Sequence, residues 1–349
     1  MMIISDFKNL PIATNEYEQK VIQFCESWMN GQEYFTLKTS GSTGEPKPIQ
    51  LTRKQMEASA LLTGKTFGLQ AGDRALVCLN VEYIAGTMML VRGMVLGLEL
   101  LIVEATSNPL IDLPNLPFDF AAFVPLQLQT ILSADDNFLH VLNQMKAIIV
   151  GGAAVGVQLA EMIQRLKVPV FSTYGMTETV SHIAIRALNG NITDNFQVLE
   201  GVRIGVDERN CLNIVAAASN FELIQTNDIV EIVDNQTFRL VGRFDNIINS
   251  GGIKIQLEKV ENAFEPLLKS LNITRFFAFG IPDDRLGQKL ILVLETDYLS
   301  EEQKSTLLSS VKTTLSTYQI PKAIFTISTF SETATSKIDK KATIKRLNL

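Results

Sequence analysis

One loop of the sequence gathers groups that bind anions. Residues 39–47 read T-S-G-S-T-G-E-P-K and join a predicted strand to a segment before a predicted helix. Glycines let backbone N–H groups approach an anion, hydroxyl side chains donate further hydrogen bonds, and Lys47 supplies positive charge. This composition suits a polyphosphate, but the loop is not a Walker A motif because Pro46 precedes the lysine and Gly41 and Gly44 are too close. Taken alone, it is more typical of a solvated surface turn.

Four further segments place complementary groups along the chain. Residues 174–178, Y-G-M-T-E, follow a predicted buried strand, at the end where open α/β sheets bind ligands. Residues 226–228, T-N-D, carry a carboxylate able to hold ribose hydroxyls, and residues 242–246, G-R-F-D-N, offer an arginine for ribose or phosphate. Residues 335–342 leave Lys337 on a predicted loop near the C-terminus. Each segment alone could be a turn, a salt bridge or a solvated charge, but five in this order are hard to obtain by chance.

The hydrophobic pattern predicts a scaffold that brings these segments together. Strands alternate with helices through the first half of the chain, with strands at residues 34–38, 75–79, 98–103, 120–124, 147–150 and 168–172 and helices at residues 17–29, 52–67, 87–96, around 127, and 155–166. Thr52 and Gln55 form a capping-box pattern at the start of the second helix. This alternation predicts a largely parallel sheet covered on both faces.

The pattern changes after residue 200. Residues 201–240 carry short alternating runs, which predict a small antiparallel β unit. Beyond Gly242, helices at residues 257–271 and 301–315 and strands at 275–280, 290–294 and 323–327 predict a compact α+β unit. The expected fold class is therefore α/β, with two domains. Residues 1–244 form a large α/β domain with a mainly parallel sheet plus the antiparallel unit, and residues 245–349 form a small mobile α+β domain.

Composition excludes several classes of function. The 349 residues are 46% hydrophobic and 19% charged, so the chain can form cores and should not be disordered. A net charge of -6 without a basic window argues against a nucleic-acid partner. Only two histidines, His140 and His182, are available for a Ser-His-Asp triad or a multi-histidine metal site, which makes both hard to assemble.

The cysteines and the hydrophobic stretches indicate a cytoplasmic protein without a membrane span. Cys25, Cys78 and Cys211 lie far apart and lack C-x-x-C spacing, so neither a disulfide framework nor a zinc site is expected. Asp6 and Lys8 interrupt the N-terminal segment where a signal peptide would need an apolar core. The most apolar stretch, residues 87–103, contains two charged residues and divides into a helix and a strand.

From Thr39 onward the sequence resembles the adenylate-forming superfamily of acyl-CoA synthetases, carrier-protein adenylation domains and luciferases. The resemblance implies an ATP-dependent ligase that uses Mg²⁺ and CoA. Lys337, Glu178 and Thr177 are then the catalytic candidates, with Glu178 also the magnesium ligand. The residues that it assigns to ATP binding are Thr39, Ser40, Gly41, Ser42, Thr43, Gly44, Lys47, Gly151, Gly152, Ala153, Thr173, Tyr174, Gly175, Met176, Asp228 and Arg243.

The chemistry that the resemblance implies has two half-reactions. A carboxylate is repelled by a polyphosphate, so magnesium and Lys337 are expected to offset charge while acyl-AMP and pyrophosphate form. A thiolate then attacks the acyl-adenylate, a mixed anhydride with a good leaving group. The C-terminal domain is expected to rotate between the steps about Asp245, although an ordinary linker turn explains that residue equally well. Gly251, Gly252 and Ile253 would then line the CoA tunnel.

A shorter N-terminal region and three sequence segments resemble the compact o-succinylbenzoyl-CoA synthetases of menaquinone biosynthesis. Only 38 residues precede the phosphate loop, where the superfamily usually has well over a hundred, and the segments are residues 174–186, 207–212 and 243–252. That substrate has a second carboxylate, for which Arg92, His182 and Arg186 are candidates, with Tyr83 at the pocket wall. An ion pair of Arg92 with Glu99 or Glu82, a satisfied half-buried His182 and core packing of Tyr83 are the structural alternatives.

Two positions depart from the superfamily pattern, and two other functions remain open. Asn227 and Ser336 each stand where a glycine is usual, and Ser336 narrows the backbone freedom of the loop that carries Lys337. The alternatives are an enzyme that transfers another aryl or acyl acid to a carrier protein, and a catalytically silent AMP-binding module. The silent module is disfavoured because the charged residues of the site are all retained. A homodimer is the hypothesis for assembly.

Overall fold

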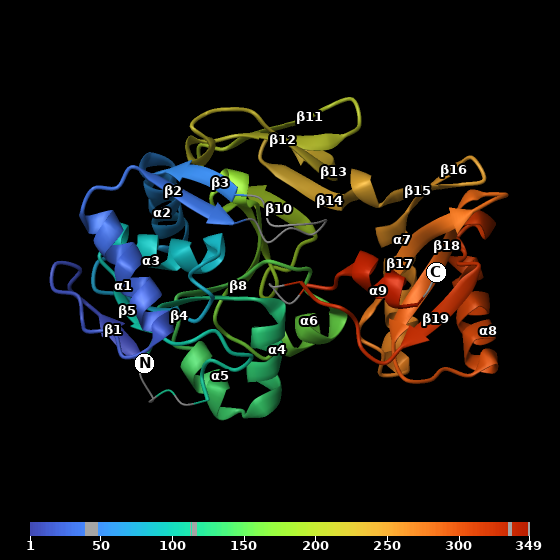
Figure 1. Cartoon of the computed structure of the whole chain (residues 1–349), viewed down its shortest axis with the longest axis horizontal. Coiled ribbons are helices and arrows are strands. Elements are labelled where there is room, and N and C mark those ends of the chain that lie inside the picture. The colour runs from blue at the N-terminus through green and yellow to red at the C-terminus, as the bar shows by residue number, and fades with distance from the viewer. Residues whose placement is uncertain (39–47, 112, 114–116, 334–336, 348–349) are drawn as a thin grey trace.

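A twelve-stranded sheet forms the larger part of the molecule in the computed structural model (Figure 1), which describes residues 1–38, 48–111, 113, 117–333 and 337–347. The strand order is β1-β5-β4-β6-β7-β8-β9-β10-β14-β13-β12-β11. In chain order the strands are β1 (Met2–Ile4), β4 (Arg74–Val77), β5 (Glu99–Ile102), β6 (Phe120–Phe123), β7 (Ala147–Val150), β8 (Val170–Gly175), β9 (His182–Ala187), β10 (Asn195–Val198), β11 (Arg203–Val206), β12 (Cys211–Val215), β13 (Ile224–Asp234) and β14 (Thr237–Arg243).

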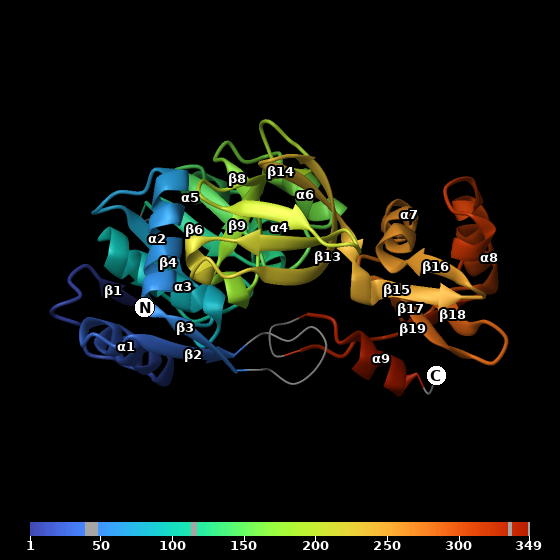
Figure 2. The same cartoon turned by 90° about the horizontal axis from the view of Figure 1, so that it is seen from above.

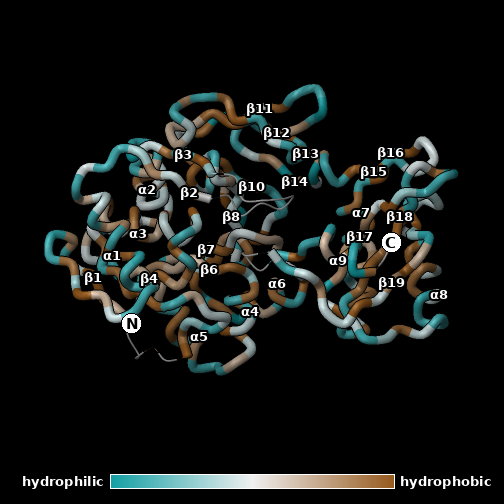
Figure 3. The backbone as a smooth tube through the Cα atoms, in the orientation of Figure 1, coloured by the Kyte–Doolittle hydropathy of each residue, from teal (hydrophilic) through white to brown (hydrophobic). Residues whose placement is uncertain are grey.

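Strands β5, β4, β6, β7 and β8 are parallel and lie between two layers of helices. Their side chains alternate between two hydrophobic clusters, which is why the strands are apolar throughout. One cluster includes residues of α4 (Pro125–Ala134), α5 (Asn137–Leu142) and α6 (Val157–Ile163), and the other includes residues of α1 (Glu16–Met29), α2 (Arg53–Phe67) and α3 (Ile84–Leu96). Apolar segments follow these strands through the interior, as Figure 3 shows.

The antiparallel strands continue the same hydrogen-bonded sheet. Strand β9 returns against β8 through the short 3₁₀ turn η1 (Thr177–Thr179), with Val180 at a positive φ of 64°. The sheet then extends through β10, β14, β13, β12 and β11. The antiparallel region thus begins at β9, earlier than the predicted start at residue 201, because the sequence does not show that the turn after β8 reverses the chain.

Two smaller sheets complete the described fold. Strands β2 (Tyr34–Lys38) and β3 (Pro48–Thr52) form a hairpin-like pair, and α2 follows β3 with the predicted capping box of Thr52 and Gln55. The five-stranded sheet contains β15 (Ile247–Ser250), β16 (Ile253–Gln256), β17 (Phe276–Asp283), β18 (Gly287–Glu295) and β19 (Ala323–Ile327). Around it lie α7 (Leu257–Ser270), α8 (Glu301–Ser310) and α9 (Lys340–Arg346), as the turned view in Figure 2 shows.

The short segment η3 (Phe244–Asn246) connects β14 of the large sheet to β15 of the five-stranded sheet. A polar contact also joins α6 and α7, because Glu161 pairs with Lys269 at 2.5 Å. The α/β fold class is confirmed, with an antiparallel extension and a separate small α+β sheet. The division into domains 1–244 and 245–349 stays a prediction.

Most predicted elements are present, but two helices are shorter than expected. The helix predicted at residues 155–166 is α6 (Val157–Ile163), which starts after Gly156, and the helix predicted at 301–315 ends at Ser310. A 3₁₀ turn follows it, where β-branched Val311 and Thr313 lower the α-helical propensity. Among the described residues, no helix is long and apolar enough to cross a membrane. Cys25, Cys78 and Cys211 are buried and form no disulfide.

Candidate active site

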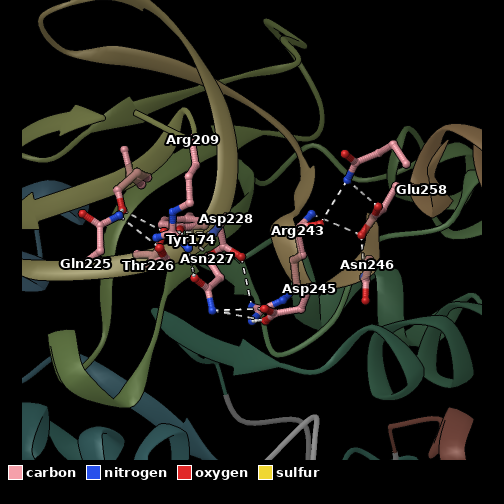
Figure 4. Close-up of polar contacts among 12 residues, drawn as sticks. Tyr174, Arg209, Gln225, Thr226, Asn227, Asp228, Arg243, Asp245, Asn246 and Glu258 are labelled. Atoms are coloured by element: carbon pink, nitrogen blue, oxygen red, sulfur yellow. Dashed lines mark hydrogen bonds and ion pairs between the residues drawn. The ribbon is translucent and has the colours of Figure 1, made fainter. Parts of the chain in front are cut away.

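Strands β8, β13 and β14 bring together three of the predicted ATP-binding residues, Tyr174, Asp228 and Arg243 (Figure 4). The strand register places Arg243 directly opposite Asp228. Arg243 Nη1 donates to Asp228 Oδ1 at 3.0 Å, and the Tyr174 hydroxyl donates to Asp228 Oδ2 at 2.6 Å. Thr226 Oγ1 accepts from the Asp228 backbone N–H at 3.0 Å, within β13. Asp228 is thus a buried carboxylate held from two sides.

The electrostatics of this group follow from burial and charge. Burial raises the pKa of the Tyr174 hydroxyl, and the Asp228 carboxylate raises it further, so the phenol stays a donor. Burial opposes the charge of Arg243, but hydrogen bonding to Asp245 and the charges of Asp228 and Asp245 hold its pKa above the usual value. The cluster therefore holds the Asp228 carboxylate in a fixed orientation beside Arg243, whose side chain is 39% exposed.

The ends of β7 and β8 adjoin because these strands are parallel neighbours. Thr173 Oγ1 donates to the Val150 carbonyl at 3.3 Å, and a Cβ at Gly151 would lie 2.5 Å from the same hydroxyl. Gly152 follows with a φ of +85°, which suits glycine. The predicted segment from Gly151 to Ala153 therefore lies against Thr173, beside the turn that begins at Tyr174. The phosphate-loop candidates Thr39 to Lys47 lie outside the described residues.

The turn after β8 positions the predicted magnesium ligand. Glu178 is half-buried on η1, between buried Thr177 and Thr179. Gly175 allows the chain to return closely, since a Cβ there would lie 2.7 Å from the His182 Cα. The described residues contain no group of three or more metal-binding side chains. A single carboxylate nevertheless fits magnesium, because Mg²⁺ is usually held by one or two carboxylates together with substrate phosphates and water.

The charge of Lys337 interacts with that of Arg243. The Lys337 backbone N–H donates to Thr333 Oγ1 at 3.2 Å, and the Thr333 N–H donates to the Lys337 carbonyl at 2.8 Å, so two hydrogen bonds hold its backbone. Burial lowers the pKa of the Lys337 ammonium, and the charge of Arg243 lowers it further.

Two of the predicted acid-pocket residues meet below the η1 turn. Arg92, on α3, is 2% exposed, and its Nη2 donates to Ser181 Oγ at 2.7 Å. The same hydroxyl lies 3.1 Å from His182 Nδ1. Arg92 Nε donates to Thr63 Oγ1 at 3.2 Å and Nη1 contacts the Met89 sulfur at 3.4 Å. Ser181, absent from the sequence-based candidates, therefore bridges the pair.

Both structural alternatives for this pair were wrong. Among the described residues no carboxylate forms an ion pair with Arg92, because Glu99 pairs with Arg74 and Glu82 with Lys20. Burial lowers the Arg92 pKa to about 10.

His182 is 7% exposed, more buried than the predicted half-buried state, and its Nε2 has no hydrogen-bond partner among the described residues. Burial, then the charge of Arg92, lower its pKa to about 3, so the imidazole is neutral. Neither outcome could be seen in the sequence, because both depend on how α3 packs against the start of β9.

The other candidates are not brought to this cluster. Arg186 packs over the Phe196 ring, 5.2 Å from its centroid, and lies 3.9 Å from Asp194. Tyr83 precedes the first turn of α3, where its carbonyl accepts from the Thr87 N–H at 3.0 Å. Gly251, Gly252 and Ile253 form the exposed β15–β16 turn and the start of β16. Their roles toward acid and CoA stay predictions.

Comparison with known proteins identifies the family. Residues 5–205, more than half of the chain, match the AMP-binding enzyme family. The chain belongs to this family. A solved structure of an acyl-CoA synthetase (AMP-forming)/AMP-acid ligase II-like protein from Dyadobacter fermentans is 46% identical, covering 99% of this chain and 100% of that chain with a TM-score of 0.67.

Curated relatives share less sequence with this member of the AMP-binding enzyme family. A 2-succinylbenzoate–CoA ligase from Staphylococcus epidermidis is 25% identical, over 87% of this chain and 68% of that protein. The corresponding enzyme from Listeria monocytogenes is 23% identical, over 94% and 73%. The o-succinylbenzoate coenzyme A synthetase from Bacillus subtilis, solved with ATP and magnesium ion, shares the fold with a TM-score of 0.71 at 21% identity, over 88% of this chain and 69% of that chain.

The family and the enzyme class are therefore as predicted. The sequence resemblance to the adenylate-forming superfamily is confirmed, and so is the prediction of an acid–thiol ligase. Ser181 was not among the residues predicted from the sequence. It lies in the segment at residues 174–186 that carries the resemblance, but its contact with Arg92 depends on how α3 packs against the chain after η1.

Proposed function

We propose that this AMP-binding enzyme uses ATP to activate o-succinylbenzoate as an acyl-adenylate and then transfers the acyl group to CoA. The proposal rests mainly on one observation, the hydrogen bonds of Tyr174 and Arg243 to the buried Asp228 carboxylate, and the charge interaction of Lys337 with Arg243 supports it. The Asp228 carboxylate can accept hydrogen bonds from the ribose of a nucleoside, and the Lys337 ammonium can donate to a reacting phosphate. The names of the curated relatives support the choice of acid and of CoA.

In the first half-reaction, the Asp228 carboxylate accepts hydrogen bonds from the ribose hydroxyls while the hydrogen bond from Arg243 holds it in place. The Lys337 ammonium donates to the α-phosphate and to the attacking carboxylate, which lowers their mutual repulsion. Glu178 would hold magnesium, which supplies further positive charge to the leaving pyrophosphate. No side chain is needed as a general base, because the attacking carboxylate is already deprotonated at neutral pH.

The second carboxylate of the acid requires a fixed cation, for which Arg92 is the strongest candidate. It is fully buried and forms no carboxylate ion pair among the described residues. A buried guanidinium is costly unless an anion neutralises it. Ser181 and His182 provide two further polar groups beside it. Ser181 and His182 follow closely after η1, which carries Glu178. One acid could therefore reach both Arg92 and the site of Glu178.

The experiment is pyrophosphate release from ATP and magnesium with a panel of acids, in the presence and absence of CoA. The panel contains o-succinylbenzoate, benzoate and fatty acids, and Lys337→Ala is the control. Release that is strongest with o-succinylbenzoate and lost in the variant supports the proposal. Release with another acid overturns the substrate, and no release with any acid alongside intact ATP binding overturns the ligase activity.

A further inference from the structure

The connection between the two larger sheets is held by side chains of the large sheet. Asn227, on β13, donates through Nδ2 to the Asp245 carboxylate at 3.1 and 3.4 Å. Arg209 packs over the Phe244 ring, with its guanidinium carbon 4.9 Å from the centroid. Phe244 and Asp245 are the first two residues of η3, so both contacts fall on the connection itself (Figure 4).

Arg209 and Asn227 act as one unit. Arg209 Nη1 donates to Asn227 Oδ1 at 3.1 Å, and Arg209 Nε donates to Asp207 Oδ2 at 2.7 Å. Asp207 in turn accepts from the Cys211 N–H at 2.9 Å, which anchors the unit to the start of β12. The amide of Asn227 therefore points its donor toward the connection because its acceptor is occupied from the other side.

The five-stranded sheet holds the same connection from its own side. Glu258, at the start of α7, accepts from the Arg243 backbone N–H at 3.3 Å and from Asn246 Nδ2 at 2.5 Å. Gln256 donates to the Arg243 carbonyl at 3.3 Å. The connection is thus bonded from both sides, and Asn227 and Arg209 are the large-sheet half of that arrangement.

We propose that Asn227 and Arg209 are positioning residues that hold Asp245, and with it the C-terminal unit, in the orientation that places Lys337 at the nucleotide site. This inference rests on the proposed function. The network also couples the connection to the site, because Arg243 bonds both Asp228 and Asp245.

The proposal predicts unequal effects on the two half-reactions. In the proposed reaction adenylation needs Lys337 at the site, whereas the resemblance implies a different orientation of the C-terminal unit for thioester formation. Loss of the Asn227 amide therefore slows adenylation and leaves thioester formation unchanged or faster. Loss of the hydrogen bonds from Asn227 to the partly exposed Asp245 carboxylate should make adenylation about 5-fold slower in Asn227→Gly.

The test measures each half-reaction in a single turnover. Pyrophosphate release without CoA reports adenylation, and thioester formation from preformed o-succinylbenzoyl-adenylate reports the second step. Asn227→Gln retains an amide donor and should recover at least half of the lost rate. Gln197→Gly is the matched control, since it also puts glycine at an exposed strand position in the large sheet and removes one exposed hydrogen bond, from Thr237.

Equal rates in Asn227→Gly and wild type, or an equal loss in both steps, overturn the proposal. A second readout does not depend on the reaction. Spin labels at Ser133→Cys and Ser309→Cys, one exposed position on each unit, report the distance between the units, and the buried native cysteines should not react. The proposal expects a broader distance distribution in Asn227→Gly than in wild type, and identical distributions overturn it even if the enzyme proves inactive toward every acid.

Discussion

Replacement of Arg92 by methionine should raise the free energy of unfolding and also raise the KM for o-succinylbenzoate. The fall of the Arg92 pKa from 12.5 to about 10 corresponds to about 3 kcal/mol against the buried charge. Methionine removes that cost and fills a similar volume. The two hydroxyls that lose a donor keep other partners, because Thr63 donates to the Ser59 carbonyl at 3.0 Å and Ser181 bonds His182 at 3.1 Å.

Lost hydrogen bonds offset about 1–2 kcal/mol of this gain. Arg92→Met should therefore raise the free energy of unfolding by about 1–2 kcal/mol, measured by urea denaturation without substrate. The same change should raise the KM for o-succinylbenzoate at least about 30-fold, since a buried charge pair is lost. The KM for ATP should stay within about 2-fold, because Arg92 does not contact the nucleotide cluster.

Arg92→Lys is the matched control, because it keeps the charge but not the planar donors. Its KM for the acid should lie between those of the wild type and Arg92→Met. The reasoning is refuted if Arg92→Met loses more than about 2 kcal/mol of stability while the KM for the acid is unchanged. Arg92 would then be a structural residue whose hydrogen bonds outweigh the desolvation of its charge.

Three further changes have defined outcomes. The His182 pKa of about 3 lies below the unfolded value of 6.5, so between these pH values the unfolded chain binds more protons than the folded chain. The free energy of unfolding should therefore fall by about 2 kcal/mol from pH 6.5 to 5. Urea titrations at both pH values should show that His182→Asn abolishes this fall. Tyr174→Phe removes the 2.6 Å bond to Asp228 and should raise the KM for ATP about 5-fold with little change in kcat; an unchanged KM would speak against a ribose-binding role. Gly175→Ala should cost about 1–3 kcal/mol in thermal unfolding, because the new Cβ would press on the backbone of Ser181 and His182, and a variant as stable as wild type would contradict that contact.

The sequence was sufficient to predict the elements with a strong periodic pattern. The apolar strands around Ala147 and the capping box of Thr52 are examples, because the local pattern in each case matches the final burial and hydrogen bonding. Short elements such as β1, β3 and α5 were missed, since three to six residues carry too little periodicity. Their positions depend on pairing partners far away in the chain.

The site could be predicted from the sequence where the type of a residue indicates its chemistry. Asp228, Arg243 and Tyr174 were expected to share a ligand, and the structure brings them into hydrogen-bond contact. The partner of Arg92 could not be predicted, because a helix pattern does not say which carboxylates or hydroxyls another element will present. The same limit applies to Asn227, whose bond to Asp245 arises from the pairing of β13 with β14 and the turn into η3.

We propose above that this AMP-binding enzyme joins a dicarboxylic aromatic acid to CoA through an acyl-adenylate. Mass spectrometry of a reaction with ATP, magnesium and o-succinylbenzoate tests it most directly. The account predicts o-succinylbenzoyl-AMP when CoA is withheld and its conversion to the CoA thioester when CoA is added, with neither product from Lys337→Ala. Hydrolysis of ATP without an adenylate, or an adenylate that forms equally in Lys337→Ala, would contradict it.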